Sequence, residues 1–143
     1  LVADSCRMVI DRRFLIEEAL HDVKREVIDL LDDIKHSRDN FDYNLRDLFE
    51  VIPTMTQEDA PVVTAVSQAI ELVLNETPTM VVSPGTYDQK HIDRIGKLSD
   101  CIAYGPGILT LAHQPDEYVN VQDMLDSAKV MATALHNLLH GAY

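Results

Sequence analysis

Residues 104–119 read YGPGILTLAHQPDEYV, and they stand where a predicted strand gives way to the clearest predicted helix of the chain. Glycine and proline make this stretch a loop, because both residue types favour turns and interrupt regular structure. The loop holds one histidine, His113, four residues before Glu117. Loops carried by rigid elements are where binding and catalytic groups concentrate. His113 is therefore the first candidate for a functional residue.

The region around this loop has the pattern of alternating helices and strands. Asn120 is placed to cap a helix that runs to Leu139, with apolar residues at helical spacing: Val121, Leu125, Ala128, Met131, Leu135 and Leu138. Upstream, Thr56 is placed to cap a helix that runs to about residue 73. Two short apolar strands are predicted at residues 79–82 and 101–104, with a helical turn over residues 89–95 between them.

The N-terminal third predicts a β-α-β unit. Residues 5–13 alternate between apolar and polar side chains, as a half-buried strand does, and residues 42–52 alternate again until Pro53 closes the segment. Between them, residues 17–34 carry the apolar stripe Leu20, Val23, Val27, Leu31 and Ile34 of an amphipathic helix. We therefore predict an α/β protein with two parts, residues 1–53 and 54–143.

Composition excludes several classes of partner. The chain has 24 acidic and 12 basic residues, a net charge of −12, whereas nucleic acids and anionic membranes attract basic surfaces. No apolar run is long enough to span a bilayer. Cys6 and Cys101 lack metal-ligand spacing, so we expect buried thiols in predicted strands and a cytoplasmic location. The first residue is not methionine, which suggests a piece of something longer.

The residues of the 104–119 loop allow more than one interpretation. His113 is a metal ligand, a general base or a hydrogen-bonded loop histidine, and a single histidine is weak support for a metal site. Glu117 either orients the imidazole of His113 or supplies a favourable negative charge ahead of the following helix.

Two other segments carry candidate binding residues. In SPGTYD, residues 83–88, Gly85 allows the backbone to approach a ligand and Thr86 offers a hydroxyl, although an ordinary capped turn fits equally well. Arg7, Arg12 and Arg13 supply forked donors suited to a carboxylate, or salt bridges to Asp11 or Glu17.

These motifs, taken in order, resemble a known family. The order SPGTYDQKH, then a segment ending YGPG, then AHQPDEYV and a long terminal helix is similar to the C-terminal part of the acetylornithine deacetylase, succinyl-diaminopimelate desuccinylase and carboxypeptidase G family of metallopeptidases. Upstream, CRMVIDRRFL and its helix resemble the second half of the lid, or dimerisation, domain of these enzymes. The resemblance implies a ferredoxin-like lid in residues 1–53 and part of a zinc-peptidase-like α/β catalytic domain in residues 54–143.

The same resemblance implies roles for individual residues. His113 would ligate one of two divalent metal ions, usually zinc and sometimes manganese or cobalt, which activate a water molecule for cleavage of an amide bond. Arg13 would bind a substrate carboxylate, and Gly85 and Thr86 would contact the other end of the substrate. Gly107 would shape the pocket wall, and Glu117 would support the ligand His113.

Other motifs of the family do not stand at their expected place in this sequence. In the family, the H-x-D motif, the bridging aspartate and the Glu-Glu pair that hold the remaining ligands and the general base lie well upstream of the lid, whereas His91-Ile92-Asp93 and Glu17-Glu18 lie elsewhere, so no catalytic residue is assigned to this chain. We expect the isolated chain to be inactive. Its expected partners are the missing N-terminal portion of the enzyme, a small-molecule substrate and a second copy bound through the lid. The alternative is a non-catalytic module for dimerisation or for binding a small carboxylate.

Overall fold

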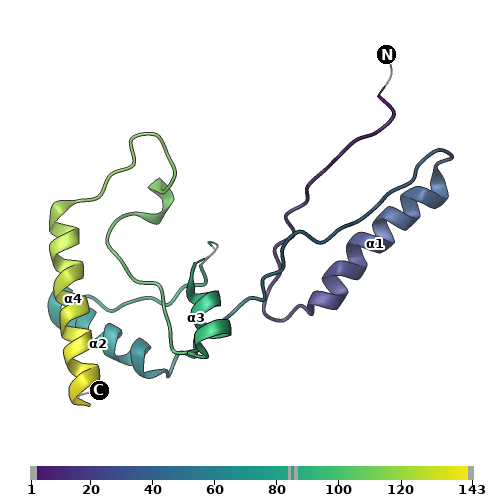
Figure 1. The fold of residues 1–143 in the computed structure, drawn as a ribbon. Helices are drawn as coiled ribbons and strands as arrows, with labels where there is room; N and C mark the ends of the chain where they lie inside the picture. Colours follow the sequence, from purple (N-terminus) through teal and green to yellow (C-terminus); the bar gives the residue numbers. More distant parts are fainter. Residues whose placement is uncertain (1–2, 84, 86, 142–143) are drawn as a thin grey trace. The chain divides into compact units, whose positions relative to one another are not determined.

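The computed structural model describes residues 3–83, 85 and 87–141, and its chain divides into two compact units, Leu1–Pro53 and Thr54–Tyr143. The first unit contains helix α1 (Leu20–Ser37). The second contains α2 (Pro61–Leu74), α3 (Gln89–Gly96), the short 3-10 helix η1 (Leu109–Leu111) and α4 (Val121–His140). Figure 1 shows these helices joined by long irregular segments.

The predicted α/β fold is wrong, because the described residues form helices and contain no strand. This holds for the expected strands at 5–13, 42–52, 79–82 and 101–104, and so the expected β-α-β lid is not observed. Alternation identifies the side of a strand that could be buried, but a strand exists only when a neighbouring backbone pairs with it. In the segment 79–82, Val81 and Val82 are 78% and 88% exposed. The cysteines also differ from expectation: Cys6 is exposed and Cys101 is half-buried.

Helix α1 confirms the apolar stripe predicted for residues 17–34, although it begins three residues later, at Leu20. Val23 is its buried residue, and the other stripe positions are half-buried. Side-chain contacts connect α1 to the segment that follows it. The Lys24 ammonium donates to the Asp47 carboxylate at 2.8 Å, and the Lys35 ammonium donates to Asp42 at 2.7 Å. Ion pairs rather than a strand ladder therefore join these segments.

Helix α2 begins at Pro61 rather than near the predicted cap, Thr56. Proline is favoured at the first helical position, since its fixed φ suits the helix and its missing N–H leaves no donor unsatisfied. The Thr56 hydroxyl instead contacts the carbonyl oxygens of Ser99, at 2.9 Å, and Cys101. The helix ends at Leu74, and the residue that caps it, Asn75, has a φ of 55° and donates its N–H to the Glu71 carbonyl.

Helices α2 and α4 lie side by side and form the main core (Figure 1). Four buried residues meet there: Ala65, Ala69, Val130 and Ala134. Their small side chains let the two helices approach closely, and partly buried residues close the edges: Val66, Ile70, Val73, Leu74, Tyr104 and Leu138. The face of α4 that packs here is not the one predicted, because Leu125, Met131 and Leu135 are more than half exposed.

Within the part of the chain that the structure describes, no helix has both the length and the apolarity needed to cross a membrane.

Candidate functional site

The loop that carries His113 is built from a series of tight backbone turns. The N–H of Leu111 donates to the Ile108 carbonyl at 3.0 Å, and the N–H of Ala112 donates to Leu109 at 3.1 Å. The next turn places the Gln114 N–H 3.1 Å from the Leu111 carbonyl. These bonds begin in η1 and continue beyond it, so the chain reaches His113 along an ordered path.

His113 itself lies in a left-handed backbone conformation, with a φ of 64°, and Asp116 has a φ of 62°. Residues other than glycine rarely adopt this region, because their Cβ approaches the backbone, and such positions persist where surrounding contacts hold them. The His113 side chain is exposed. The imidazole is therefore accessible on a loop whose backbone is constrained.

Glu117 supplies one of the contacts that hold this conformation. Its carboxylate oxygen Oε2 accepts the backbone N–H of His113 at 3.0 Å, and its own N–H donates to the Gln114 carbonyl at 3.3 Å. The contact is with the histidine backbone, not with its ring. Glu117 thus stabilises the backbone turn that carries His113, and it does not bind either nitrogen of the imidazole ring.

Gly107 lies where the two ends of the loop approach each other. It has a φ of +100°, and a Cβ built on it would be 3.5 Å from the Val119 Cγ2 atom. A side chain would fit beside Val119, but the backbone conformation would be strained for any L residue. Gly107 therefore shapes the loop through its backbone freedom.

The second predicted binding segment is a separate turn. The Gly85 N–H donates to the Ser83 hydroxyl at 3.1 Å, and a Cβ on Gly85 would lie 3.4 Å from ring atoms of Tyr87. Gly85 is exposed. Thr86, the other residue predicted here, lies outside the described residues, so its assignment stays a prediction.

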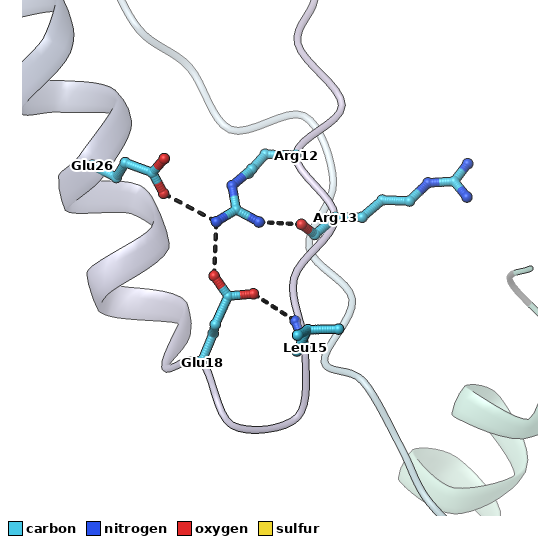
Figure 2. A network of polar contacts seen from close by, with 5 residues as sticks. All are labelled: Arg12, Arg13, Leu15, Glu18 and Glu26. Carbon is cyan, nitrogen blue, oxygen red and sulfur yellow. Dashed lines mark hydrogen bonds and ion pairs between the residues drawn. The ribbon is translucent and has the colours of Figure 1, made fainter. Parts of the chain in front are cut away.

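Arg13 belongs to the first unit, next to a network of polar contacts centred on Arg12. The Arg12 guanidinium donates to Glu18 at 2.7 Å, to Glu26 at 3.0 Å and to the backbone carbonyl of Arg13. Glu18 also accepts the backbone N–H of Leu15 at 2.6 Å. Figure 2 shows the Arg13 side chain extending away from Arg12 and both glutamates. Its guanidinium is 3.7 Å from the Asp11 carboxylate.

The electrostatics of this network favour its charged forms. The hydrogen bonds that Arg12 donates to Glu18 and Glu26 raise the pKa of Arg12, and the bond that Glu18 accepts from Arg12 lowers the pKa of Glu18. The residues alone predict the same role for Arg12 and Arg13, with Asp11 or Glu17 as salt-bridge partners. Glu26 was missed because it lies fourteen residues away, on the side of α1 that faces Arg12.

A pocket in the second unit is lined by residues other than those predicted for the site. A pocket of about 470 Å³ lies between the segment before α2 and residues 99–100, and none of the predicted site residues lines it. Across the described residues, no group of three or more histidine, cysteine, aspartate or glutamate side chains is placed to hold a metal ion. The structure brings Gly107, His113 and Glu117 together in one loop, while Arg13 and Gly85 belong to other segments.

Comparison with known proteins gives consistent matches over nearly the whole chain. The profile of peptidase family M20/M25/M40 matches residues 5–137. A succinyl-diaminopimelate desuccinylase of Hydrogenovibrio crunogenus is 30% identical over 139 residues, which is 97% of this chain and 35% of that protein. An N-formyl-4-amino-5-aminomethyl-2-methylpyrimidine deformylase of Bacillus subtilis is 27% identical over 142 residues, 91% of this chain and 33% of that protein. No solved structure gives a significant match. The chain spans about a third of the length of these relatives.

Proposed function

Because the chain belongs to peptidase family M20/M25/M40, we propose that it is part of a metal-dependent amidohydrolase. The intact protein would cleave the amide bond of an N-acyl amino acid or a similar carboxylate-bearing substrate. The observation that carries this proposal is the family match over residues 5–137. The names of the two relatives describe removal of a succinyl group and of an N-formyl group, which supports small acyl groups on nitrogen as the substrate class.

The described residues of this chain do not by themselves fit a metal centre. The described part holds no suitable group of three ligands, and His113 is one exposed donor. In the proposal, His113 contributes one ligand to a two-ion centre whose other ligands come from the rest of the polypeptide. Divalent ions, with zinc first and manganese or cobalt as alternatives, would polarise the amide carbonyl and lower the pKa of a bound water.

Two further features of the chain support the proposed roles of His113 and Arg13. Glu117 holds the backbone of His113, so the imidazole is presented from a constrained turn. Arg13 extends from a segment whose backbone is held by Arg12 and Glu18, and a guanidinium is suited to binding a carboxylate with two hydrogen bonds. We propose that Arg13 binds the substrate carboxylate and that Gly85, Thr86 and Gly107 line the substrate pocket.

The experiment that tests this function uses the chain alone and the chain mixed with the remaining portion of the polypeptide. The chain alone should show no hydrolysis of N-succinyl or N-formyl substrates above background, because one ligand cannot hold the metal centre. The mixture should bind about two zinc ions and hydrolyse such substrates, and His113→Ala should reduce the zinc content to about one ion. His36→Ala, a change at another exposed histidine, is the control and should leave the zinc content unchanged.

Two results would contradict the proposal. Turnover by the isolated chain would show that the metal ligands lie elsewhere than proposed. A mixture that binds a small carboxylate but neither zinc nor an amide substrate would favour the non-catalytic binding module.

A further inference from the structure

The C-terminal end of helix α4 carries two histidines on the same side. His136 and His140 are four positions apart, and residues with this spacing are neighbours on a helix surface. Their imidazole rings lie against each other, with ring centroids 4.5 Å apart and ring planes inclined at 74°. Both residues are exposed. The helix therefore presents a pair of adjacent, accessible imidazoles.

The backbone holds the two histidines in register up to the end of the helix. Gly141 caps α4 with a φ of 64°, and its N–H donates to the Asn137 carbonyl, so the turn between the histidines is closed. Ala134 and Leu138 pack in the core with α2. These two residues lie about half a turn away from the histidines, so the core fixes the helix and leaves the imidazoles outside it.

The separation of the two rings suits one metal ion bound between them. A histidine nitrogen binds a divalent transition metal at about 2.0–2.1 Å. Two imidazoles on one ion then have ring centroids about 4.5 Å apart at a right angle and about 5.2 Å apart in a tetrahedral arrangement. The rings already have this separation, and the remaining adjustment is rotation about χ2, which is broad in histidine. The helix backbone needs no change to form the site.

The chemistry of the pair selects a class of ion. Imidazole nitrogen suits copper, nickel and zinc, whereas magnesium and calcium prefer oxygen ligands. The negative end of the helix dipole and the net charge of −12 both favour a cation at this position. Among the described residues, no further histidine, cysteine, aspartate or glutamate extends the pair to three ligands. Water would therefore complete the coordination.

We propose that His136 and His140 form a chelating site for one divalent transition metal ion, with Cu²⁺ bound most tightly and Ni²⁺ or Zn²⁺ less tightly. Joining two binding groups raises the overall affinity by about 10² to 10⁴ over that of one group, and this gain separates the pair from a single surface histidine. The site uses no residue of the loop that carries His113, and it holds whether or not the proposed amidohydrolase function does.

The test titrates the metal alone into the chain. A Cys6→Ser, Cys101→Ser background removes the two thiols, which also bind soft metal ions. Isothermal titration calorimetry with NiCl₂ should show one ion per chain at the strongest site, and His140→Ala should weaken this binding at least about a hundredfold. CuCl₂ should bind more tightly than NiCl₂, and MgCl₂ should not bind measurably at this site.

A matched control keeps the number of histidines and changes only their spacing. The variant Leu135→His, His136→Ala separates the pair by five positions, about 140° around the helix, so the rings no longer share a side. Leu135 is 57% exposed, so the change does not disturb the core. This variant should bind Ni²⁺ as weakly as His140→Ala does. Circular dichroism without metal should be the same for all the proteins, which separates lost binding from lost helix.

A second measurement identifies the ligands directly. Cu²⁺ is paramagnetic and broadens the NMR signals of nuclei close to it. At less than one equivalent of Cu²⁺, the ring signals of His136 and His140 should broaden before those of the other exposed histidines, such as His21 and His36.

Four results would overturn the proposal. They are the absence of Ni²⁺ binding, Ni²⁺ binding that His140→Ala does not weaken, equal affinity in the spacing variant, and broadening that begins at another histidine. None of them bears on the proposed function, because the chain is titrated without the remaining portion of the polypeptide and no hydrolysis is measured. The zinc counts for the two-ion centre should be repeated in a His136→Ala, His140→Ala background, so that the pair adds nothing to them.

Discussion

At the scale of single residues, the structure assigns contacts that spacing could not distinguish. Glu117 lies four residues after His113, which suggested either a partner for the imidazole or a charge ahead of a helix. Its carboxylate accepts the His113 backbone N–H instead. In the same way, Arg12 and Arg13 are neighbours in sequence, but Arg12 holds the local backbone while Arg13 extends away from it (Figure 2).

The contact between Glu117 and His113 gives a prediction for the loop. Glu117→Ala removes the acceptor of the His113 N–H, so this amide should open more often. With about 1 kcal/mol for such a bond, its hydrogen exchange should be about five times faster. Glu117→Gln keeps an acceptor oxygen and should give a smaller change. Equal exchange rates in all three proteins would show that the turn is held by its backbone bonds alone.

At the scale of elements, the positions of the helices were predicted well and their buried faces less well. The apolar stripe predicted for α1 is confirmed, because this helix has a single row of apolar residues and therefore only one side that could be buried. On α4 the larger residues were expected to be buried, but the smaller Ser127, Val130 and Ala134 pack in the core. Ala65 and Ala69 on α2 allow the two helices to approach closely, and at that distance small residues of α4 fit between them. The sequence alone does not show which side of one helix will pack on the other.

Two adjacent residues of α4 test this assignment. Val130 is fully buried, and Met131, the next residue, is 57% exposed. Val130→Ala should lower the free energy of unfolding by about 2 kcal/mol, from lost apolar contact and the cavity left behind. Met131→Ala should change it by less than about 0.5 kcal/mol, as exposed positions usually do. Urea unfolding followed by circular dichroism measures both. A larger loss for Met131→Ala would mean that the side of α4 that carries Met131 is the buried one.

The ion pairs around α1 predict a dependence on pH. Contacts with Arg12, Lys35 and Lys24 lower the pKa of Glu18, Asp42 and Asp47, respectively, so the folded unit favours their ionised forms. Their stabilising contribution is therefore complete above the ordinary carboxyl pKa of about 4 and is lost as the pH falls below it.

We expect thermal melts of the chain to move to lower temperature as the pH falls from 5 to about 3. The variant Arg12→Gln, Lys24→Gln removes two of the three cationic partners and should show a smaller shift over the same range. Because these ion pairs lie at the surface, with each side chain at least one third exposed, 1 M salt should also reduce the shift. Identical pH dependence in parent and variant would exclude these ion pairs as its cause.

At the scale of the whole molecule, many large apolar side chains are exposed in both units. Each unit has a small core: Val23 is the buried hydrophobic residue of the first, and the second centres on α2 and α4. The chain spans about a third of the length of its two relatives. Family membership was confirmed, whereas the α/β fold was not.

The sequence by itself determined the family, the positions of the helices and the candidate histidine. Those conclusions depend on local order, on motifs such as YGPG and AHQPDEYV and on helical periodicity, all of which are present in a single chain. Three properties depend on the tertiary structure and not on any local pattern. They are the side of α4 that is buried, the donor from which the Glu117 carboxylate accepts a hydrogen bond, and the presence or absence of a neighbouring backbone that pairs with each alternating segment. A helix closes its hydrogen bonds within one segment, whereas a strand, a core and a metal site each need a second segment to complete them.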